Sequence, residues 1–141
     1  MPNQKDRIII DTNLLISFLL TKDFSRFDSI ISGQNPTFIF SDILLNEFAE
    51  VIQRTKFKKY FNPEDAKNLL RKIRGRTDYI KVTTEVNICR DLKDNFLLNL
   101  AIDGQASHLI TGDKDLLILK KIKTTTILTI TEYIEIFKPG L

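Results

Sequence analysis

Hydrophobic and polar residues follow one another in short blocks that predict alternating strands and helices. The run from Arg7 to Ile10 ends in three isoleucines, a β-branched pattern typical of a strand buried on both faces. Asp11-Thr12-Asn13 supplies capping residues, and the pattern then predicts a helix from Leu14 to Leu20. A second apolar run, Phe38 to Phe40, predicts a strand before a helix from Asp42 to about Arg54.

The second half of the chain continues this alternation. Asn62-Pro63-Glu64 is typical of a helix start, and the helix is expected to end near Gly75. The further predicted elements are a strand at Tyr79 to Val82, a helix from Asp94 to about Gln105, a strand at His108 to Thr111, a short helix at Lys114 to Lys121, a strand at Thr125 to Thr129 and a closing helix at Thr131 to Phe137. Alternating strands and helices indicate βαβ units. We therefore predict an α/β fold, a single three-layer domain over residues 1–141 with a mostly parallel central sheet flanked by helices.

Composition sets broad limits on the class of protein. The chain has 141 residues, of which 43% are hydrophobic, as is ordinary for one globular domain. Its apolar runs fall short of the roughly 18 to 20 residues of a membrane helix, and the polar stretch from Met1 to Arg7 does not resemble a secretory signal. The single cysteine, Cys89, suits a reducing compartment. We therefore expect a cytoplasmic protein that is not inserted in a membrane.

Two acids follow predicted strands. Asp11 comes directly after Arg7 to Ile10, and Asp113 follows the strand at His108 to Thr111 after a single glycine. Ligands of open parallel sheets bind beyond the carboxyl ends of the strands. Each aspartate on its own has an ordinary alternative explanation, as a helix cap or a turn residue.

Two further acids are predicted on helices with their side chains toward the core. Glu47 shares a helix ridge with Ile43 and Val51, and an ionised acid is expensive to bury unless it is paired or binds a metal. The ordinary alternative is a side chain that bends out to water. Asp94 shares a face with apolar residues, whereas Asp103, nine residues along, is expected to face solvent. For Asp94 the ordinary alternative is a first-turn acid that favours the helix dipole.

Considered together, the four carboxylates favour a metal site. Carboxylates brought close to one another repel, and a shared hard cation such as Mg²⁺ or Mn²⁺ relieves that repulsion. The chain shows no Cys/His spacing of a zinc site. A nearby acid, Asp91, is an alternative to Asp94 as the third ligand.

These motifs resemble those of the PIN-domain family. The resemblance rests on Ile-Ile-Ile-Asp-Thr-Asn at 8–13, the helical Glu47, the run from Cys89 to Leu97 and the run from Ile110 to Leu117, in the family's order over nearly the whole chain. The chain is especially similar to the VapC-like toxins of bacterial toxin–antitoxin systems. The resemblance implies a PIN fold and an Mg²⁺- or Mn²⁺-dependent endoribonuclease that hydrolyses RNA. It also implies a cognate antitoxin protein as partner and a homodimer.

The resemblance also implies roles for individual residues. By position, the acids that match the family's catalytic and metal-binding quartet are Asp11, Glu47, Asp94 and Asp113. Asp115 is implied as a further metal ligand. Asn13 and Thr111 fall where the family has polar residues near the metal and the scissile phosphate, which implies substrate binding. The third of these motifs, the run from Cys89 to Leu97, is poorer in aspartate than the commonest form in the family. Asp91 therefore stays an alternative to Asp94.

Several alternatives stay open at this point. Basic residues gather around Arg54 to Phe61 and Lys67 to Arg76, with aromatic residues interleaved in the first segment. They form either a groove for an RNA backbone with a base stacked on an aromatic ring, or a solvated helix face with the aromatic residues packed inward or against a second subunit. The rival to an enzyme is an inactive PIN-fold module that binds RNA or another partner. A phosphoacceptor domain requires paired acids after the first strand, which Asp11 lacks, and the P-loop motif is absent.

Overall fold

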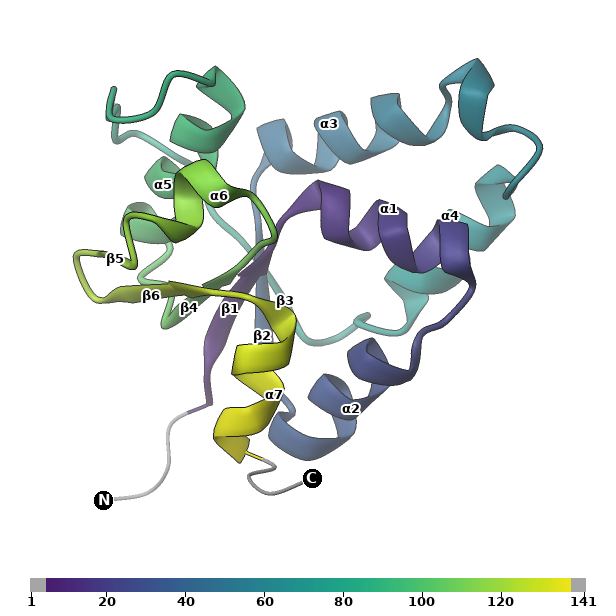
Figure 1. Ribbon diagram of the computed structural model, residues 1–141, viewed down its shortest axis with the longest axis horizontal. Coiled ribbons are helices and arrows are strands. Elements are labelled where there is room, and N and C mark those ends of the chain that lie inside the picture. Colours follow the sequence, from purple (N-terminus) through teal and green to yellow (C-terminus); the bar gives the residue numbers. More distant parts are fainter. Residues whose placement is uncertain (1–4, 138–141) are drawn as a thin grey trace.

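The computed structural model describes residues 5–137, whose six strands form one sheet in the order β3-β2-β1-β4-β6-β5 (Figure 1). The strands are β1 (Arg7–Ile10), β2 (Thr37–Phe40), β3 (Thr77–Tyr79), β4 (His108–Ile110), β5 (Lys121–Ile122) and β6 (Thr125–Leu128). Every neighbouring pair is parallel except β5 and β6, which are antiparallel. The predicted α/β fold with a mostly parallel sheet is confirmed. The extreme ends of the predicted domain, 1–4 and 138–141, lie outside the described residues.

Helices connect these strands and lie on both sides of the sheet (Figure 1). They are α1 (Thr12–Thr21), α2 (Ser25–Gln34), α3 (Asp42–Ile52), the short 3-10 helix η1 (Thr55–Phe57), α4 (Pro63–Arg71), α5 (Leu92–Asp103), α6 (Lys114–Leu117) and α7 (Ile130–Phe137). Among residues 5–137, none of the helices is both long enough and apolar enough to cross a membrane.

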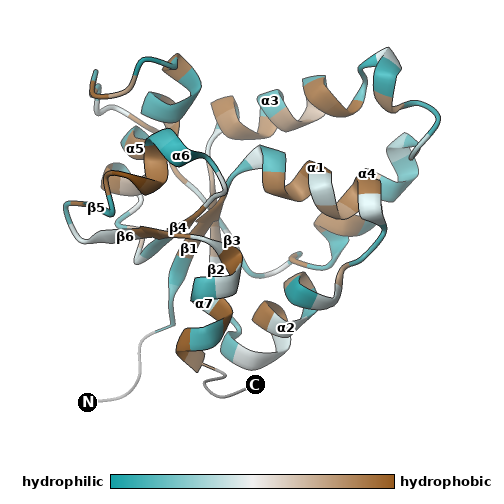
Figure 2. Cartoon of the chain, viewed as in Figure 1, coloured by the Kyte–Doolittle hydropathy of each residue, from teal (hydrophilic) through white to brown (hydrophobic). Residues whose placement is uncertain are grey.

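Alternate residues of β2 face the two helical layers, as the period of a strand requires. The ring of Phe38 lies 5.7 Å from that of Phe27 in α2. On the opposite face Ile39 lies against Gly104, where an added Cβ would come within 3.0 Å of the Ile39 side chain. Figure 2 shows the central strands largely hydrophobic, in agreement with the burial of Ile8 and Ile9, which are 0% exposed. The parallel sheet is therefore buried on both faces, as its isoleucine run predicts.

Two predicted segments have different bounds in the structure, and helix α2 was not among the predicted elements. Helix α2 was not predicted, because it buries only Phe27 and Ile30 and its N-cap, Phe24, makes no side-chain capping bond. The strand predicted at Tyr79 to Val82 lies two residues earlier, at Thr77–Tyr79, where it pairs with β2. The predicted helix from Lys114 to Lys121 ends at Leu117, because Lys120 has a positive φ of 63° and the chain then enters β5.

Asp103, expected to face solvent, is partly exposed, but its carboxylate also has partners that the sequence did not indicate. Its carboxylate accepts hydrogen bonds from the backbone N–H groups of Thr83 at 2.6 Å and Thr84 at 2.8 Å, and also from the Thr84 hydroxyl. These bonds favour the ionised form and lower the pKa of Asp103. The residue is thus a structural anchor for the segment that follows β3.

Candidate metal centre

Asp11 and Thr111 follow the adjacent parallel strands β1 and β4, so their side chains meet at the carboxyl edge of the sheet. Ile10 is in register with Ile110. The Thr111 hydroxyl donates to Asp11 Oδ2 at 2.8 Å and accepts from the backbone N–H of Asp113 at 3.0 Å. Thr111 is 1% exposed, and its hydroxyl therefore fixes both aspartates relative to each other.

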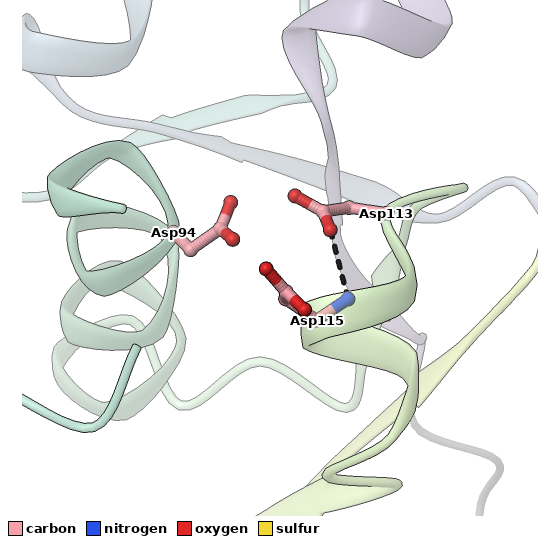
Figure 3. A group of neighbouring side chains, drawn as sticks. All are labelled: Asp94, Asp113 and Asp115. Carbon is pink, nitrogen blue, oxygen red and sulfur yellow. Dashed lines mark hydrogen bonds between the residues drawn. The ribbon is translucent and has the colours of Figure 1, made fainter. Parts of the chain in front are cut away.

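Three carboxylates gather beside this pair. One oxygen from each of Asp94, Asp113 and Asp115 lies within 4.8 Å of the others. Asp94 extends from α5, while Asp113 and Asp115 come from the start of α6 on the facing side (Figure 3). The N–H of Asp115 donates to Asp113 Oδ1 at 2.9 Å, which orients that carboxylate. The predicted site residues Asp94, Asp113 and Asp115 are thus brought together from two elements.

Asp94 is the buried member of this group. It is 4% exposed, and its Oδ2 is buried without a hydrogen-bond partner among residues 5–137. Burial, followed by the neighbouring Asp113 carboxylate, raises the pKa of Asp94 to about 7. An unpartnered buried carboxylate oxygen beside other acids is the environment that a bound cation relieves.

Asp91 has a different position from Asp94. It is the N-cap of α5, where its Oδ1 accepts from the backbone N–H of Lys93 at 2.9 Å, and its side chain is exposed. Asp94 therefore joins the three-carboxylate group, whereas Asp91 satisfies the first turn of the helix.

Asp11 and Glu47 lie outside that group; Asp11 is electrostatically coupled to it through Asp113 and Asp94, and Glu47 is coupled to Asp11. Burial raises the pKa of Asp11, the Thr111 hydrogen bond opposes this, and the Asp113 charge adds to the rise. Glu47 is partly buried on α3. Burial raises its pKa, the charge of Lys93 opposes this, and the charges of Asp11 and Asp91 raise it further. All five predicted acids thus belong to one electrostatic neighbourhood.

Asn13 and Thr111, the two residues implied in substrate binding, differ in exposure. The backbone N–H of Asn13 donates to Asp11 Oδ1 at 3.1 Å, and its side chain is exposed at the start of α1. Thr111 is buried, with its hydroxyl used both as donor and as acceptor.

Arg90, which the sequence analysis did not single out, pairs with the acidic group. Its guanidinium donates to both carboxylate oxygens of Asp115, at 3.2 and 3.4 Å, and its side chain is 90% exposed. Its only signal in the sequence is that it lies in the third acidic motif, the run from Cys89 to Leu97. The segment before α5 is irregular, so no periodicity indicates where its side chains lie.

A row of polar side chains on α5 holds that segment in place. Asn95 Oδ1 accepts from the N–H of Ile88 at 3.2 Å and from that of Cys89 at 2.9 Å, and its amide donates to the Cys89 carbonyl at 3.1 Å. Asn99 Oδ1 accepts from the N–H of Val86 at 2.8 Å. Asn95, Asn99 and the anchoring Asp103 are spaced by four residues and so lie along one side of the helix. We call residues 83–90 the strap; it carries Arg90 to the acids.

The donor set fits a hard divalent cation. Carboxylate oxygens from Asp94, Asp113 and Asp115 converge, and one buried oxygen of Asp94 has no other described partner. Such oxygen donors suit Mg²⁺ or Mn²⁺ better than zinc, which favours Cys and His. The lone histidine, His108, lies at the start of β4, at the opposite end of the strand from Thr111.

The basic segments lie on η1 and α4 and in the turns that follow each of them. Phe57 and Phe61 stack on each other at 5.6 Å, and Phe61 is buried, whereas Tyr60 is exposed. The surface ion pairs in these segments are Arg54 with Glu50, Arg71 with Glu64 and Lys72 with Asp28. These contacts agree with the solvated-face alternative over much of the two segments.

Comparison with known proteins identifies the family. The family model of the PIN domain matches residues 7–115, a stretch that includes every predicted site residue. The chain belongs to the PIN-domain family. An uncharacterised protein of Methanocaldococcus jannaschii is 30% identical over 129 residues, which cover 85% of this PIN-domain chain and 79% of that protein.

The fold of this PIN domain also has a solved counterpart. The crystal structure of VapBC2 from Rickettsia felis, bound to a DNA fragment from its promoter, contains a similar chain, with a TM-score of 0.56 and 18% identity. The similarity covers 86% of this chain and 96% of that chain. The predicted PIN fold is thereby confirmed.

Proposed function

We propose that this PIN domain is a divalent-metal-dependent endoribonuclease that hydrolyses RNA phosphodiester bonds. The observation that carries the proposal is Asp94, a buried carboxylate with one unpartnered oxygen, within 4.8 Å of Asp113 and Asp115. PIN domains are generally nucleases, and the match covers the segment that holds all of these acids. Asp11, Glu47, Asp94, Asp113 and Asp115 would hold Mg²⁺ or Mn²⁺.

A cation held there would lower the pKa of a bound water and neutralise charge on the phosphoryl group. The protein's own part is to position the acids and, at Asp11, to oppose the effect of burial on the carboxylate. Thr111 and the N–H of Asn13 supply hydrogen bonds to both oxygens of Asp11, which favour its charged form against burial. We assign Thr111 as a positioning residue, because its hydroxyl is buried and already has two partners. The exposed Asn13 side chain is free to approach an RNA phosphate.

We further propose that the protein is the toxin of a toxin–antitoxin pair, acting in the cytoplasm with a cognate antitoxin protein and as a homodimer. Support comes from the fold shared with VapBC2 of Rickettsia felis, which was solved on promoter DNA. Induced expression of the protein in a bacterial host is expected to arrest growth, and the Asp11→Asn variant is expected not to. Unimpaired growth under strong expression of an RNA-cleaving protein would contradict the toxin role.

The nuclease proposal is tested on purified protein with labelled single-stranded and structured RNA, in Mg²⁺ or Mn²⁺ and then in EDTA. Asp11→Asn and Asp113→Asn are expected to abolish metal-dependent cleavage while the protein stays folded. Asp28→Asn is the matched control, since its exposed carboxylate only pairs with Lys72 on the surface. Such a pair contributes about 0–1 kcal/mol, so cleavage should persist.

The rival function is an inactive PIN-fold module that binds RNA or another partner. It predicts RNA binding without cleavage in either metal, and binding that survives Asp11→Asn. Cleavage that persists unchanged in both acidic variants would instead contradict the assigned site.

A further inference from the structure

Adjoining hollows run along the carboxyl edge of the sheet, from Glu47 toward β3. The first is small and is lined by Glu47, Lys93 and Phe96, and it shares Phe96 and Ile43 with a second hollow of about 160 Å³. The second shares Ile43 with a third, of about 470 Å³, which Tyr79 also lines. We call this series the edge groove, and it begins at an acid of the proposed metal centre.

Tyr79 forms a shared wall of the third hollow and of a fourth, of about 380 Å³, at the far end of the edge groove. Both volumes fall within the roughly 300 to 1,000 Å³ typical of ligand sites. The Tyr79 side chain is 63% exposed, and its ring is supported by Phe40, whose centroid lies 6.3 Å away. A large aromatic side chain is therefore presented to solvent at a concave surface.

The charge around Tyr79 favours an anionic ligand. The fourth hollow is lined by Arg71, Arg74 and Thr77 together with mostly apolar residues, and no carboxylate lines it. Arg71 already pairs with Glu64, whereas Arg74 forms no ion pair within the part of the chain that the structure describes. Acids line the other three hollows, at Glu47, Glu85 and Asp42, so the fourth hollow is the part of the groove without a carboxylate in its lining.

Strand register places Tyr79 close to the acids. Tyr79 is in register with Phe40, and β2 pairs with β1 so that Phe38 is opposite Ile8. Phe40 therefore lies level with Ile10, the residue before Asp11. At about 4.8 Å between neighbouring strands, Tyr79 lies two strands or about 10 Å from that position. One bound strand of RNA can thus span both places.

We propose that Tyr79 and Arg74 form a subsite for a nucleotide of single-stranded RNA that flanks the scissile bond. The base stacks on the exposed ring of Tyr79, and the guanidinium of Arg74 contacts a phosphate. Stacking of this kind tolerates every base, because each base has a π-face. The subsite rests on the proposed ribonuclease function and gives it a preference for unpaired RNA.

The test measures binding of a fluorescein-labelled single-stranded RNA of about 12 nucleotides by anisotropy, in the Asp113→Asn background, which prevents cleavage. Tyr79→Ala is expected to weaken binding about 5- to 150-fold, the range for loss of one stacked base. Tyr79→Phe keeps the ring and should stay close to the parent, while Arg74→Gln should weaken binding and reduce its salt dependence. Tyr60→Ala is the matched control, because Tyr60 is 48% exposed beside a lysine but does not line the groove.

The outcomes separate the subsite from the proposed function. The Asp113→Asn protein should bind the RNA of about 12 nucleotides more tightly than it binds a dinucleotide. Adding Tyr79→Ala should remove most of that difference in affinity. If the wild-type protein cleaves RNA but Tyr79→Ala and Tyr60→Ala bind the labelled RNA equally well, the subsite is overturned and the nuclease proposal stands. RNA binding that needs Tyr79, in a protein that cleaves nothing, would support the subsite and overturn the nuclease. A Tyr79-dependent protein partner, with RNA binding unaffected, would show instead that the edge groove binds a peptide.

Discussion

The Thr111 hydroxyl donates a hydrogen bond of 2.8 Å to Asp11 although the two residues are 100 positions apart in the sequence. The bond exists because β1 and β4 are parallel neighbours, so residues that follow them meet at one edge. The same hydroxyl accepts from the N–H of Asp113. One buried side chain thereby couples the first and the last of the acidic motifs.

Thr111→Val is expected to destabilise the protein and to reduce cleavage. Valine has a similar shape but leaves the buried Asp11 short of a donor and the Asp113 N–H short of an acceptor, at a cost of about 1–3 kcal/mol. Thr111→Ser keeps the hydroxyl and should retain most activity. Urea unfolding and cleavage rates measure the two effects. Equal activity of the valine and serine variants would show that the hydroxyl does not position the acids.

The pH dependence of stability should show the raised pKa of Asp94. The folded protein keeps this proton up to a pKa of about 7, whereas the unfolded chain loses it near 3.8. Asp94 therefore makes metal-free stability fall as pH rises from about 4 to about 7, and the full penalty remains above that range. Asp94→Asn removes the penalty and should stabilise the metal-free protein at pH 8, by about 1–3 kcal/mol.

Thermal or urea unfolding of the two proteins at pH 4 and pH 8 measures this difference directly. Added Mn²⁺ should stabilise the wild-type protein at pH 8 and have little effect on Asp94→Asn, because the metal binds the ionised carboxylate. If Asp94→Asn is less stable than the wild-type protein at pH 8 without metal, the ionised Asp94 carboxylate does not destabilise the metal-free fold.

Sequence reasoning predicted the centre of this site because its rules are local. A buried β-branched run followed by Asp11 or Asp113 marks a strand end, and a helical period places Asp94 on the apolar side. These signals need no knowledge of which strands pair. They also predicted the α/β class, since the alternation of strand and helix patterns appears along the chain itself.

The missed features depend on tertiary contacts. Helix α2 has a weak apolar stripe and forms because Phe27 and Ile30 pack into the core. The strap has no period of its own, and its conformation is set by side chains of α5. The anchoring role of Asp103 and the position of Arg90 therefore could not be predicted from the sequence. Strand β5 has two residues and exists through its pairing with β6.

Arg90→Gln is expected to raise the affinity for Mn²⁺. The Arg90 guanidinium competes with a cation for Asp115, at 3.2 Å, and its removal frees that carboxylate. Because exposed ion pairs are weak, the gain should be about two- to fivefold. It should shrink at high salt. Isothermal calorimetry measures the change, with Arg26→Gln on α2 as a control for net charge. Equal gains in both variants would assign the effect to overall charge.

Asn95→Ala should release the strap from α5. Asn95 is 3% exposed and makes three part-buried hydrogen bonds to the backbone of Ile88 and Cys89, so its loss leaves those backbone groups without this partner. A cost of about 1–3 kcal/mol is expected. Local opening should also increase amide hydrogen exchange at residues 86–90 more than in the sheet.

Asn46→Ala, at an exposed position on α3, should leave both quantities unchanged. Hydrogen exchange followed by mass spectrometry distinguishes local opening from global unfolding. Because a released strap no longer holds Arg90 beside Asp115, Asn95→Ala should also raise Mn²⁺ affinity, as Arg90→Gln does. If Asn95→Ala increases exchange without changing Mn²⁺ affinity, the strap does not hold Arg90 at the acids.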